Sequence, residues 1–250
     1  MKNNSMSWLC KKINERWSMK NILISVVFTL LALFGTGTLV AKYYGEDAEK
    51  ELVSPLVALD VVEVSHLTFM REEKKLARDL YLTLAEQYPQ QKFFKLIAAR
   101  AEQIHTDSMR DQLEMFNLPD PNPNSDNFPD TIGVFTGIEW GWYFTEQYDF
   151  LTDQGMISEL EALYVGAYIE ELDIKNIKLC PEVMIESGYP SPCGLAYTTQ
   201  NDLQRAYRSL LSGSEEYLRI FVRRIETVIG EGDYEAQYLT QAEVDAILGR

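Results

Sequence analysis

The chain has 250 residues, of which 46% are hydrophobic and 24% are charged. This length suits one domain of ordinary size with an appendage, and the composition excludes a fibrous, collagen-like or wholly disordered chain. Only one apolar run is long enough to cross a membrane, which excludes a protein with several membrane spans.

Charge is distributed unevenly along the chain. Residues 1–41 hold five Lys or Arg and one acid, whereas residues 42–250 hold 18 basic and 37 acidic side chains. A body this acidic repels phosphate backbones, so we expect no nucleic-acid partner. The acidic balance suits either simple solubility or cation binding.

The N-terminal part of the sequence predicts a membrane-targeting segment. Residues 22–41 (ILISVVFTLLALFGTGTLVA) carry no charge, and as a helix they would span about 30 Å, the thickness of a hydrocarbon core. The preceding charge is mostly positive, so we expect residues 1–41 to be a basic n-region and an anchor in the cell membrane, with the acidic body outside the cytoplasm. The alternatives are a cleaved signal, which would leave a secreted or periplasmic protein, and a buried core helix.

Helical spacing of apolar residues dominates after a polar spacer at residues 42–53, so residues 54–250 form the predicted domain. Its first helix begins at Ser54–Pro55 or at the capping pair Asp60 and Glu63. Four long amphipathic helices with a long connection at 117–157 predict an all-α four-helix bundle with a crossover between its second and third helices. The predicted helices cover residues 60–87, 92–116, 137–154, 158–174 and 201–229, followed by a short terminal helix capped by Thr240 and Glu243.

Three cysteines bear on the compartment. Cys10 would stay in the reducing cytoplasm, whereas Cys180 and Cys193 lie in the body, thirteen residues apart. In an oxidising compartment these two could close a disulfide loop. Two free buried thiols are the alternative.

Carboxylates interrupt the apolar stripes of three predicted helices. Glu73 lies three residues after one apolar stripe position and four before the next. Glu102 and His105 form a Glu-x-x-His, whose spacing places both side chains on one helix face. Glu170 interrupts the stripe of the third long helix, and Asp173 follows three residues later. We therefore expect carboxylates from three helices to point at the centre of the bundle.

Several buried carboxylates repel one another and lose hydration worth several kcal/mol per ion, so a cation must compensate. One or two divalent metal ions would do this, with an imidazole as the nitrogen ligand. We expect the ligands to converge with no Arg or Lys between them. The alternatives are that some acids point to solvent, or that Arg78 or Arg100 turns inward. The predicted metal ligands are Glu73, Glu102, His105 and Glu170.

At these residues the sequence resembles the ferritin-like superfamily, and more closely its uncharacterised bacterial and archaeal branch, domain of unknown function 2202. The resemblance implies a four-helix ferritin-like bundle in which the four predicted ligands match the superfamily's carboxylate and histidine positions. The resembling segments are FMREEKKLARDLYLTL (69–84), IAARAEQIHTDSM (97–109), ALYVGAYIEELDI (162–174), LLSGSEEYLRIFVR (210–223) and YEAQYLTQAEVDAI (234–247).

The chain departs from this branch in the fourth helix. The branch usually has Asn-His there, and Tyr217 stands in place of the histidine. Ser214 stands at the Glu position of a second Glu-x-x-His, so a complete two-metal site has lost a nitrogen donor. The candidate replacements for this lost ligand are the carboxylate of Asp173 and the phenolic oxygen of Tyr217.

Two functions are expected from these features. The first is an exported, membrane-anchored ferritin-like protein that binds iron or another divalent metal, as an oxidoreductase if it is an enzyme. The second is a non-enzymatic interaction module of the cell envelope with a degenerate metal site. Convergent acids favour the first, whereas Tyr217 and the presence of only two histidines, His66 and His105, favour the second. The membrane is the expected partner. The sequence does not decide whether the protein forms a dimer.

Overall fold

Helix α2 (Val61–Gln87) begins at the predicted capping pair. The Asp60 side chain accepts hydrogen bonds from the backbone amides of Val62 and Glu63, both at 2.9 Å. The Glu63 side chain in turn accepts one from the Asp60 amide at 3.1 Å. This reciprocal box satisfies amides that the first turn of a helix leaves free, and it fixes where the helix starts.

The computed structural model describes residues 58–123 and 131–250. The predicted start at Ser54–Pro55, the spacer and the apolar run of residues 22–41 lie outside the described residues. No helix within the described ranges has the length and apolar character needed to cross a membrane. These ranges contain helices and no strand, so the all-α prediction is confirmed for this part of the chain.

The second predicted helix is one continuous run in three parts. It consists of α3 (Lys92–Leu96), a π-helical turn η1 (Ile97–Glu102) and α4 (Gln103–Met115). The sequence did not predict the π-helical part. Such turns are rare in proteins, and those that occur are often found at functional sites. This one ends at Glu102, a predicted ligand.

The later helices differ from prediction mainly at their ends. The crossover helix begins four residues later than expected, and the third long helix continues one turn beyond residue 174, while the fourth long helix has its predicted bounds. The remaining elements are α5 (Gly141–Gly155), α6 (Glu159–Lys178), α7 (Glu182–Glu186), η2 (Gly194–Ala196), α8 (Asn201–Ile229) and α9 (Gln241–Leu248).

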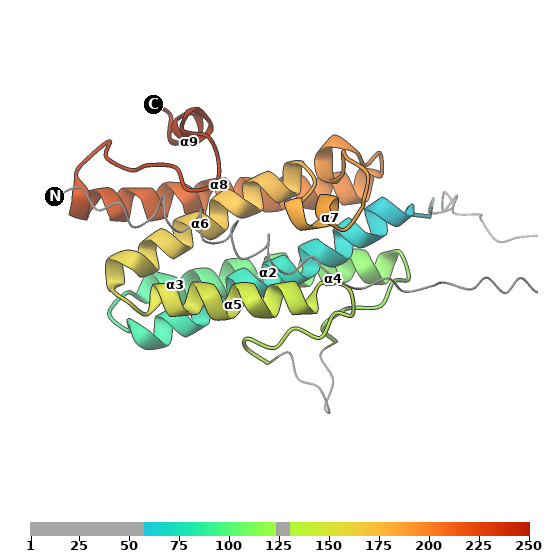
Figure 1. The fold of residues 1–250 in the computed structure, drawn as a ribbon, viewed down its shortest axis with the longest axis horizontal. Helices are drawn as coiled ribbons and strands as arrows, with labels where there is room; N and C mark the ends of the chain where they lie inside the picture. The colour runs from blue at the N-terminus through green and yellow to red at the C-terminus, as the bar shows by residue number, and fades with distance from the viewer. Residues whose placement is uncertain (1–57, 124–130) are drawn as a thin grey trace, which may run out of the picture. The chain divides into compact units, whose positions relative to one another are not determined.

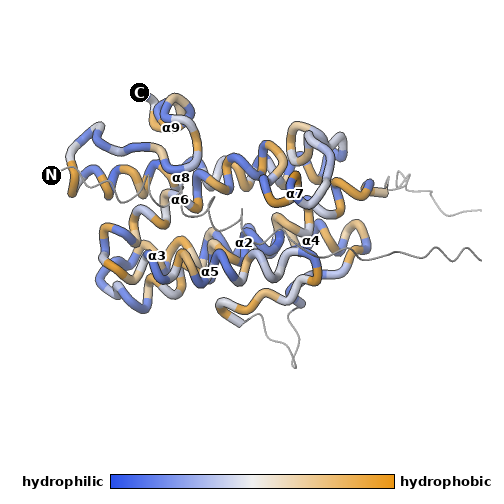
Figure 2. The backbone as a smooth tube through the Cα atoms, viewed as in Figure 1, coloured by the Kyte–Doolittle hydropathy of each residue, from blue (hydrophilic) through white to orange (hydrophobic). Residues whose placement is uncertain are grey.

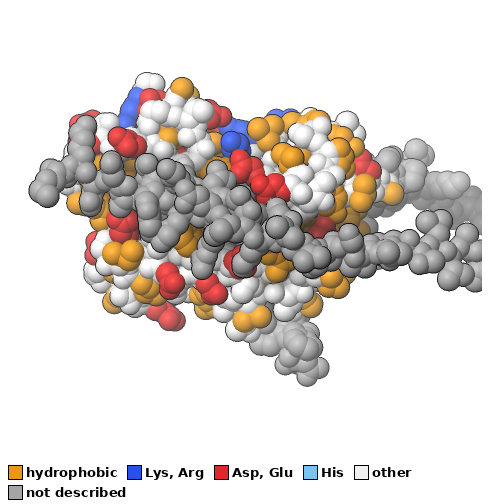
Figure 3. Space-filling model, in the orientation of Figure 1, with side chains coloured by type: hydrophobic (Ala, Val, Ile, Leu, Met, Phe, Trp, Pro, Cys, Tyr) orange, Lys and Arg blue, Asp and Glu red, His pale blue; other side chains and the backbone are white. Residues whose placement is uncertain are grey.

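Helix α6 packs along α8, and α2 packs against η1 and α4 (Figure 1). Helix α5 contacts both α2 and α6. Hydrophilic and hydrophobic residues alternate along these helices (Figure 2), and acidic side chains are scattered over the face seen in Figure 3. Helix α2 is thus enclosed by neighbours on several sides, which matters for the charged residues in its middle.

A buried carboxylate holds the C-terminal segment on α6. Glu171 accepts a hydrogen bond from the hydroxyl of Tyr234 at 2.6 Å and from the backbone amides of Gln237, Tyr238 and Leu239 at 2.9, 2.6 and 2.8 Å. Three amides and a hydroxyl satisfy this carboxylate fully. Its role is therefore to attach the chain before α9 to the body of the domain.

Cys180 and Cys193 form a disulfide with an S–S distance of 2.05 Å and Cα atoms 4.8 Å apart. This Cα separation lies within the range of ordinary disulfides. The bond closes the loop that carries α7 between α6 and α8. The structure therefore contains the bonded form and not the two free thiols that the sequence left open, and Cys10 lies outside the described residues.

Candidate functional site

Helices α2, η1 and α6 bring four carboxyl groups into the interior. Their side chains are buried, none more than 1% exposed. The charge of each of the four acts on a single lysine, Lys74. We call these residues the carboxylate cluster: Glu73, Glu102, Glu170 and Asp173.

Lys74 lies within the carboxylate cluster and is itself fully buried. Its ammonium forms an ion pair with the Oδ2 atom of Asp173 and donates to the hydroxyl of Ser214, on α8, at 3.5 Å. Burial lowers the pKa of this ammonium, but the charges of the four carboxylates outweigh burial and raise it. Lys74 is therefore a charged group and the internal counter-ion of the cluster.

The sequence prediction that no Lys or Arg lies among the ligands is wrong because of Lys74. This residue is four positions after Met70 and three before Ala77, so it continues the apolar stripe of α2 as well as Glu73 does. Arg78, one of the two alternatives considered, pairs instead with Asp79 at 2.7 Å, and Arg100 is exposed. The spacing of Lys74 was the signal that could have revealed it.

Two of the carboxylates are held by neutral donors. The Nδ2 atom of Asn176 donates to Glu73 Oε2 at 2.7 Å, and the Tyr81 hydroxyl donates to Glu170 Oε1 at 2.6 Å. One oxygen of each carboxylate in the cluster has no hydrogen-bond donor among the described residues. These oxygens are the acceptors still available to a cation. They are Glu73 Oε1, Glu102 Oε2, Glu170 Oε2 and Asp173 Oδ1.

The predicted Glu-x-x-His pair is formed at the junction of η1 and α4. His105 Nδ1 lies 3.1 Å from Glu102 Oε1. A Cβ atom at Gly213 of α8 would lie 2.6 Å from Cε1 and 2.7 Å from Nε2 of the same ring, so this glycine allows the imidazole to approach the α8 backbone. Burial first, and then the charges of Glu102 and Glu170, raise the pKa of Tyr217. Tyr217, on α8, is thus close enough to two carboxylates of the cluster for their charges to affect its pKa.

Burial sets the protonation of the cluster. It raises the pKa of Glu73 and Glu170 well above the usual range, helped by the charge of Asp173 on Glu73 and of Glu102 on Glu170. Burial also raises the pKa of Asp173, against the charge of Lys74. For Glu102, burial is outweighed by His105 and Lys74, and the pKa is lowered. Burial thus favours the protonated form of Glu73, Glu170 and Asp173, whereas Lys74 and His105 favour the charged form of Glu102.

The residues as arranged do not fit the predicted metal centre. Among the described residues, no three or more His, Cys, Asp and Glu side chains are placed to hold a metal ion. The ammonium of Lys74 already occupies the place of a cation, and it would repel a divalent ion beside it. The predicted ligands Glu73, Glu102, His105 and Glu170 are brought to one region, but around a lysine.

Comparison with known proteins places this architecture in a family. A family model described as "Uncharacterized protein domain (DUF2202)" matches residues 63–250, from the first turn of α2 to the C-terminus. The chain belongs to this family. It is 38% identical over 186 residues to uncharacterized protein MJ0754 of Methanocaldococcus jannaschii. The matched residues make up 74% of this chain and 86% of that protein.

A solved structure supports the fold of this DUF2202 domain. The crystal structure of hypothetical protein MJ0754 from Methanococcus jannaschii has a TM-score of 0.63 and 36% sequence identity. The similarity covers 78% of this chain and 97% of that chain. The shared helical fold therefore extends over most of the described part of the DUF2202 domain.

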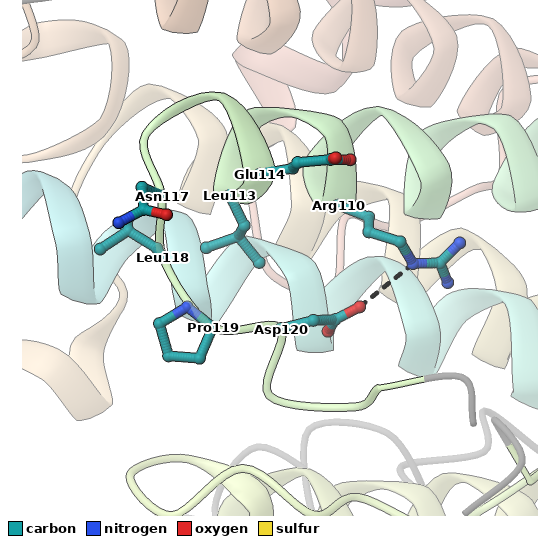
Figure 4. A pocket seen from close by; sticks show the side chains of 7 residues that line it. All are labelled: Arg110, Leu113, Glu114, Asn117, Leu118, Pro119 and Asp120. Carbon is teal, nitrogen blue, oxygen red and sulfur yellow. Dashed lines mark hydrogen bonds and ion pairs between the residues drawn. The ribbon is translucent and has the colours of Figure 1, made fainter.

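A surface groove of about 510 Å³ lies at the end of α4, apart from the carboxylate cluster (Figure 4). Arg110 Nε donates to Asp120 Oδ2 across it at 3.1 Å. No residue of the cluster lines this groove, so it gives no access to Lys74. Its lining residues are Arg110, Leu113, Glu114, Asn117, Leu118, Pro119 and Asp120.

A separate buried carboxylate of the DUF2202 domain faces the crossover. Glu72 Oε1 accepts hydrogen bonds from Asn122 Nδ2 and from the Gly137 amide, both at 3.2 Å. A Cβ atom at Gly137 would lie 2.4 Å from Glu72 Oε2, so a larger residue here would displace the Glu72 carboxyl group. Burial raises the pKa of Glu72 to about 7. Consequently this carboxyl titrates near neutral pH while it attaches the crossover to α2.

Glu72→Gln should remove one pH dependence of stability. Because the folded-state pKa is raised from 4.5 to about 7, the contribution of Glu72 is fully present below about pH 4.5 and is lost as pH rises through 7. We expect E72Q to exceed wild type in free energy of unfolding by up to about 3 kcal/mol at pH 8 and by little at pH 5. Urea titrations at both pH values measure this difference. Glu86→Gln, on the exposed side of α2, is the control, and equal gains at both pH values would contradict the assignment.

Proposed function

We propose that this chain is an exported, membrane-tethered protein of the ferritin-like superfamily whose carboxylate cluster is a closed ionic centre. In this proposal the protein is a non-enzymatic module of the cell envelope with a degenerate metal site. The observation that carries it is the ion pair of Lys74 with Asp173 inside the cluster. A buried ammonium supplies the positive charge that a metal ion would otherwise supply.

Helix packing supports the superfamily assignment. In the ferritin-like bundle four long helices surround a core, and one long crossover connects the second to the third. Here the candidates for those four are α2, the run from α3 to α4, α6 and α8, with α5 in the crossover. Contacts join α2 to α4, α6 to α8, α2 to α6 and α4 to α8, which is the pattern expected of such a bundle.

Two features support export. The basic residues 1–20 precede the uncharged run 22–41, an order that favours translocation of the acidic body on the C-terminal side of that run. The Cys180–Cys193 disulfide would persist in an oxidising compartment, whereas cytosolic thiols are kept reduced. Tethering by an uncleaved anchor and release after cleavage differ only in whether residues 1–41 remain attached.

One observation favours the second candidate, a metal-binding protein with iron-type redox activity. Four carboxylate oxygens in the cluster lack donors, and a divalent ion could use them if Lys74 turned away. Glu73, Glu102, His105 and Glu170 would then be the ligands, assisted by Asp173 or Tyr217. This candidate requires a rearrangement of α2 side chains, and the closed cluster does not.

Metal analysis of the full chain distinguishes the two candidates. The protein would be expressed without a His-tag in cells grown with added iron, manganese and zinc, and purified in detergent. We expect far less than one ion per chain. Metal at one or more ions per chain would contradict the closed centre.

A separate protease experiment tests export. We expect protease added to intact spheroplasts to digest the acidic body, and protection from protease would contradict export.

A further inference from the structure

We infer that the crossover carries a second membrane contact, an exposed apolar strip that lies against the lipid surface of the membrane to which the chain is tethered. The inference rests on the proposed function, because it assumes that residues 22–41 hold the protein in a membrane. It adds that the folded body itself touches lipid, and through which side chains. The apolar strip consists of Ile132, Val134, Ile138 and Trp142.

The apolar strip lies in a part of the chain that has few charges. Ile138 is fully exposed, and the other three residues are between 43% and 49% exposed. Residues 131–145 contain a single charged side chain, Glu139, although 24% of the whole chain is charged. One exposed apolar side chain is ordinary in a folded protein. Four of them on one short segment form a patch of the kind that marks a contact with a protein or a membrane.

The opposite side of this segment is fixed to α2. The Gly133 amide donates to Asp79 Oδ2 at 2.9 Å, and the Trp140 ring contacts Phe69 with centroids 5.6 Å apart. Phe135, between these two attachments, is buried. The apolar strip is therefore the outer side of a segment that is held along α2, and its exposure does not come from a loose loop.

The one charge in the segment is held by neighbouring side chains. The Ser65 hydroxyl of α2 donates to Glu139 Oε1 at 3.0 Å, and the Tyr189 hydroxyl donates to the same oxygen. Trp142 Nε1 donates to the backbone carbonyl of Glu139 at 3.0 Å. Contact with lipid would thus leave these polar groups with hydrogen-bond partners. Trp and Tyr are also the side chains that membrane interfaces favour, because their rings are apolar and carry one polar atom.

The tether keeps the membrane within reach of the apolar strip. Residues 42–57 separate the uncharged run from the described domain, and a chain of this length reaches at most about 55 Å. Ser65, which contacts Glu139, lies only about 8 Å along α2 from the N-cap Asp60. The starts of α2 and α5 lie toward the same end of the domain as α7 (Figure 1). Each chain therefore holds lipid at a high effective concentration near the strip.

Lipid fits the apolar strip better than a protein partner does. Four side chains, three of them about half exposed, fall well short of the roughly 800 Å² per partner that a specific protein interface buries. Tethered lipid needs less, because a few apolar side chains can enter the headgroup region. Residues 131–145 contain no Lys or Arg. The contact should therefore depend on burial of apolar surface and not on attraction to anionic lipids.

A fluorescent label at position 138 tests the contact. Ile138→Cys and the control Val228→Cys would each be combined with Cys10→Ser, and the Cys180–Cys193 disulfide would stay oxidised. Val228 is exposed and lies in the last turn of α8, about 40 Å along that helix from its start. The full chain, labelled with an environment-sensitive dye, would be reconstituted into phosphatidylcholine vesicles with or without a quencher on the lipid chains. We expect lipid quenching at position 138 to exceed that at position 228 at least about twofold, also in high salt.

Trp142→Gln distinguishes apolar contact from mere proximity to the tether. The change removes apolar surface beside the label and leaves the tether intact, so lipid quenching at position 138 should fall by at least about half. Val228→Gln is the matched control and should leave this quenching unchanged. Val134→Gln should act like W142Q and replaces it if W142Q does not fold.

The outcomes separate a failure of this inference from a failure of the tether. In a chain that floats with the vesicles, quenching at position 138 no greater than at position 228, or unchanged by W142Q and V134Q, would overturn the inference alone. A label at position 138 shielded from both the lipid quencher and aqueous iodide would point to a protein partner and also overturn it. A full chain that does not float with the vesicles would overturn the tether, and the inference with it.

Discussion

Replacing Lys74 with methionine should lower the free energy of unfolding by about 3–5 kcal/mol at pH 7. Methionine has a similar length and fills the same space, so the change removes the charge and leaves the packing largely intact. Asp173 and its neighbours would then be buried without their ammonium. Urea unfolding followed by far-UV circular dichroism measures the loss.

Two comparisons separate lost charge from lost packing. Lys95→Met alters an exposed lysine and should change stability by less than about 0.5 kcal/mol. The loss in free energy of unfolding caused by K74M should be smaller at pH 5. The pKa values of Glu73 and Glu170 are raised, so at lower pH these carboxyls take up protons and carry less of the negative charge that Lys74 would have neutralised. A K74M protein as stable as wild type at pH 7 would show that Lys74 is not the counter-ion.

Gly166→Ala should destabilise the protein by about 3 kcal/mol, at the upper end of the range for overpacked cores. A Cβ atom at Gly166 of α6 would lie 2.2 Å from Cε1 of Phe221 on α8. The Phe221 ring cannot withdraw easily, because Tyr81 and Phe93 contact it with centroids 5.5 Å away. The α6–α8 contact thus depends on a glycine opposite an aromatic ring.

A double-mutant cycle checks this contact. Phe221→Leu creates space, so Gly166→Ala should cost much less in the F221L background than in wild type. Thermal or urea unfolding of the four proteins measures the coupling. Equal costs in both backgrounds would mean that the methyl group is accommodated elsewhere and that the two helices are not limited by this ring.

Local signals explain why most helix boundaries were predictable. The capping boxes at Asp60 and Thr240 and the cap at Ser158 each satisfy backbone amides within one turn, so they can be recognised without the rest of the fold. Helix α8 has a single apolar stripe, and its bounds Asn201–Ile229 are as predicted. The π-helical turn η1 was not predictable, because its sequence IAARAE is equally suited to an α-helix.

The candidate site was predictable only in part. The stripe positions of Glu73, Glu102 and Glu170 correctly predicted that these acids are buried. Lys74 was missed because an amphipathic helix is expected to keep lysine on its solvent side. Helix α2 has almost no solvent side here, since every residue from Met70 to Tyr81 is buried. The spacing of Lys74 places it on the apolar stripe of α2, but which acid it pairs with depends on packing against neighbouring helices, and helical periodicity does not encode that.

Diffraction from crystals grown with Mn²⁺ tests the central claim most directly, because anomalous scattering locates the metal and the electron density locates Lys74. We predict that the Lys74 ammonium pairs with Asp173 and that no anomalous peak lies within the carboxylate cluster. An anomalous peak between Glu102 and Glu170, with the Lys74 side chain turned away from Asp173, would contradict the claim.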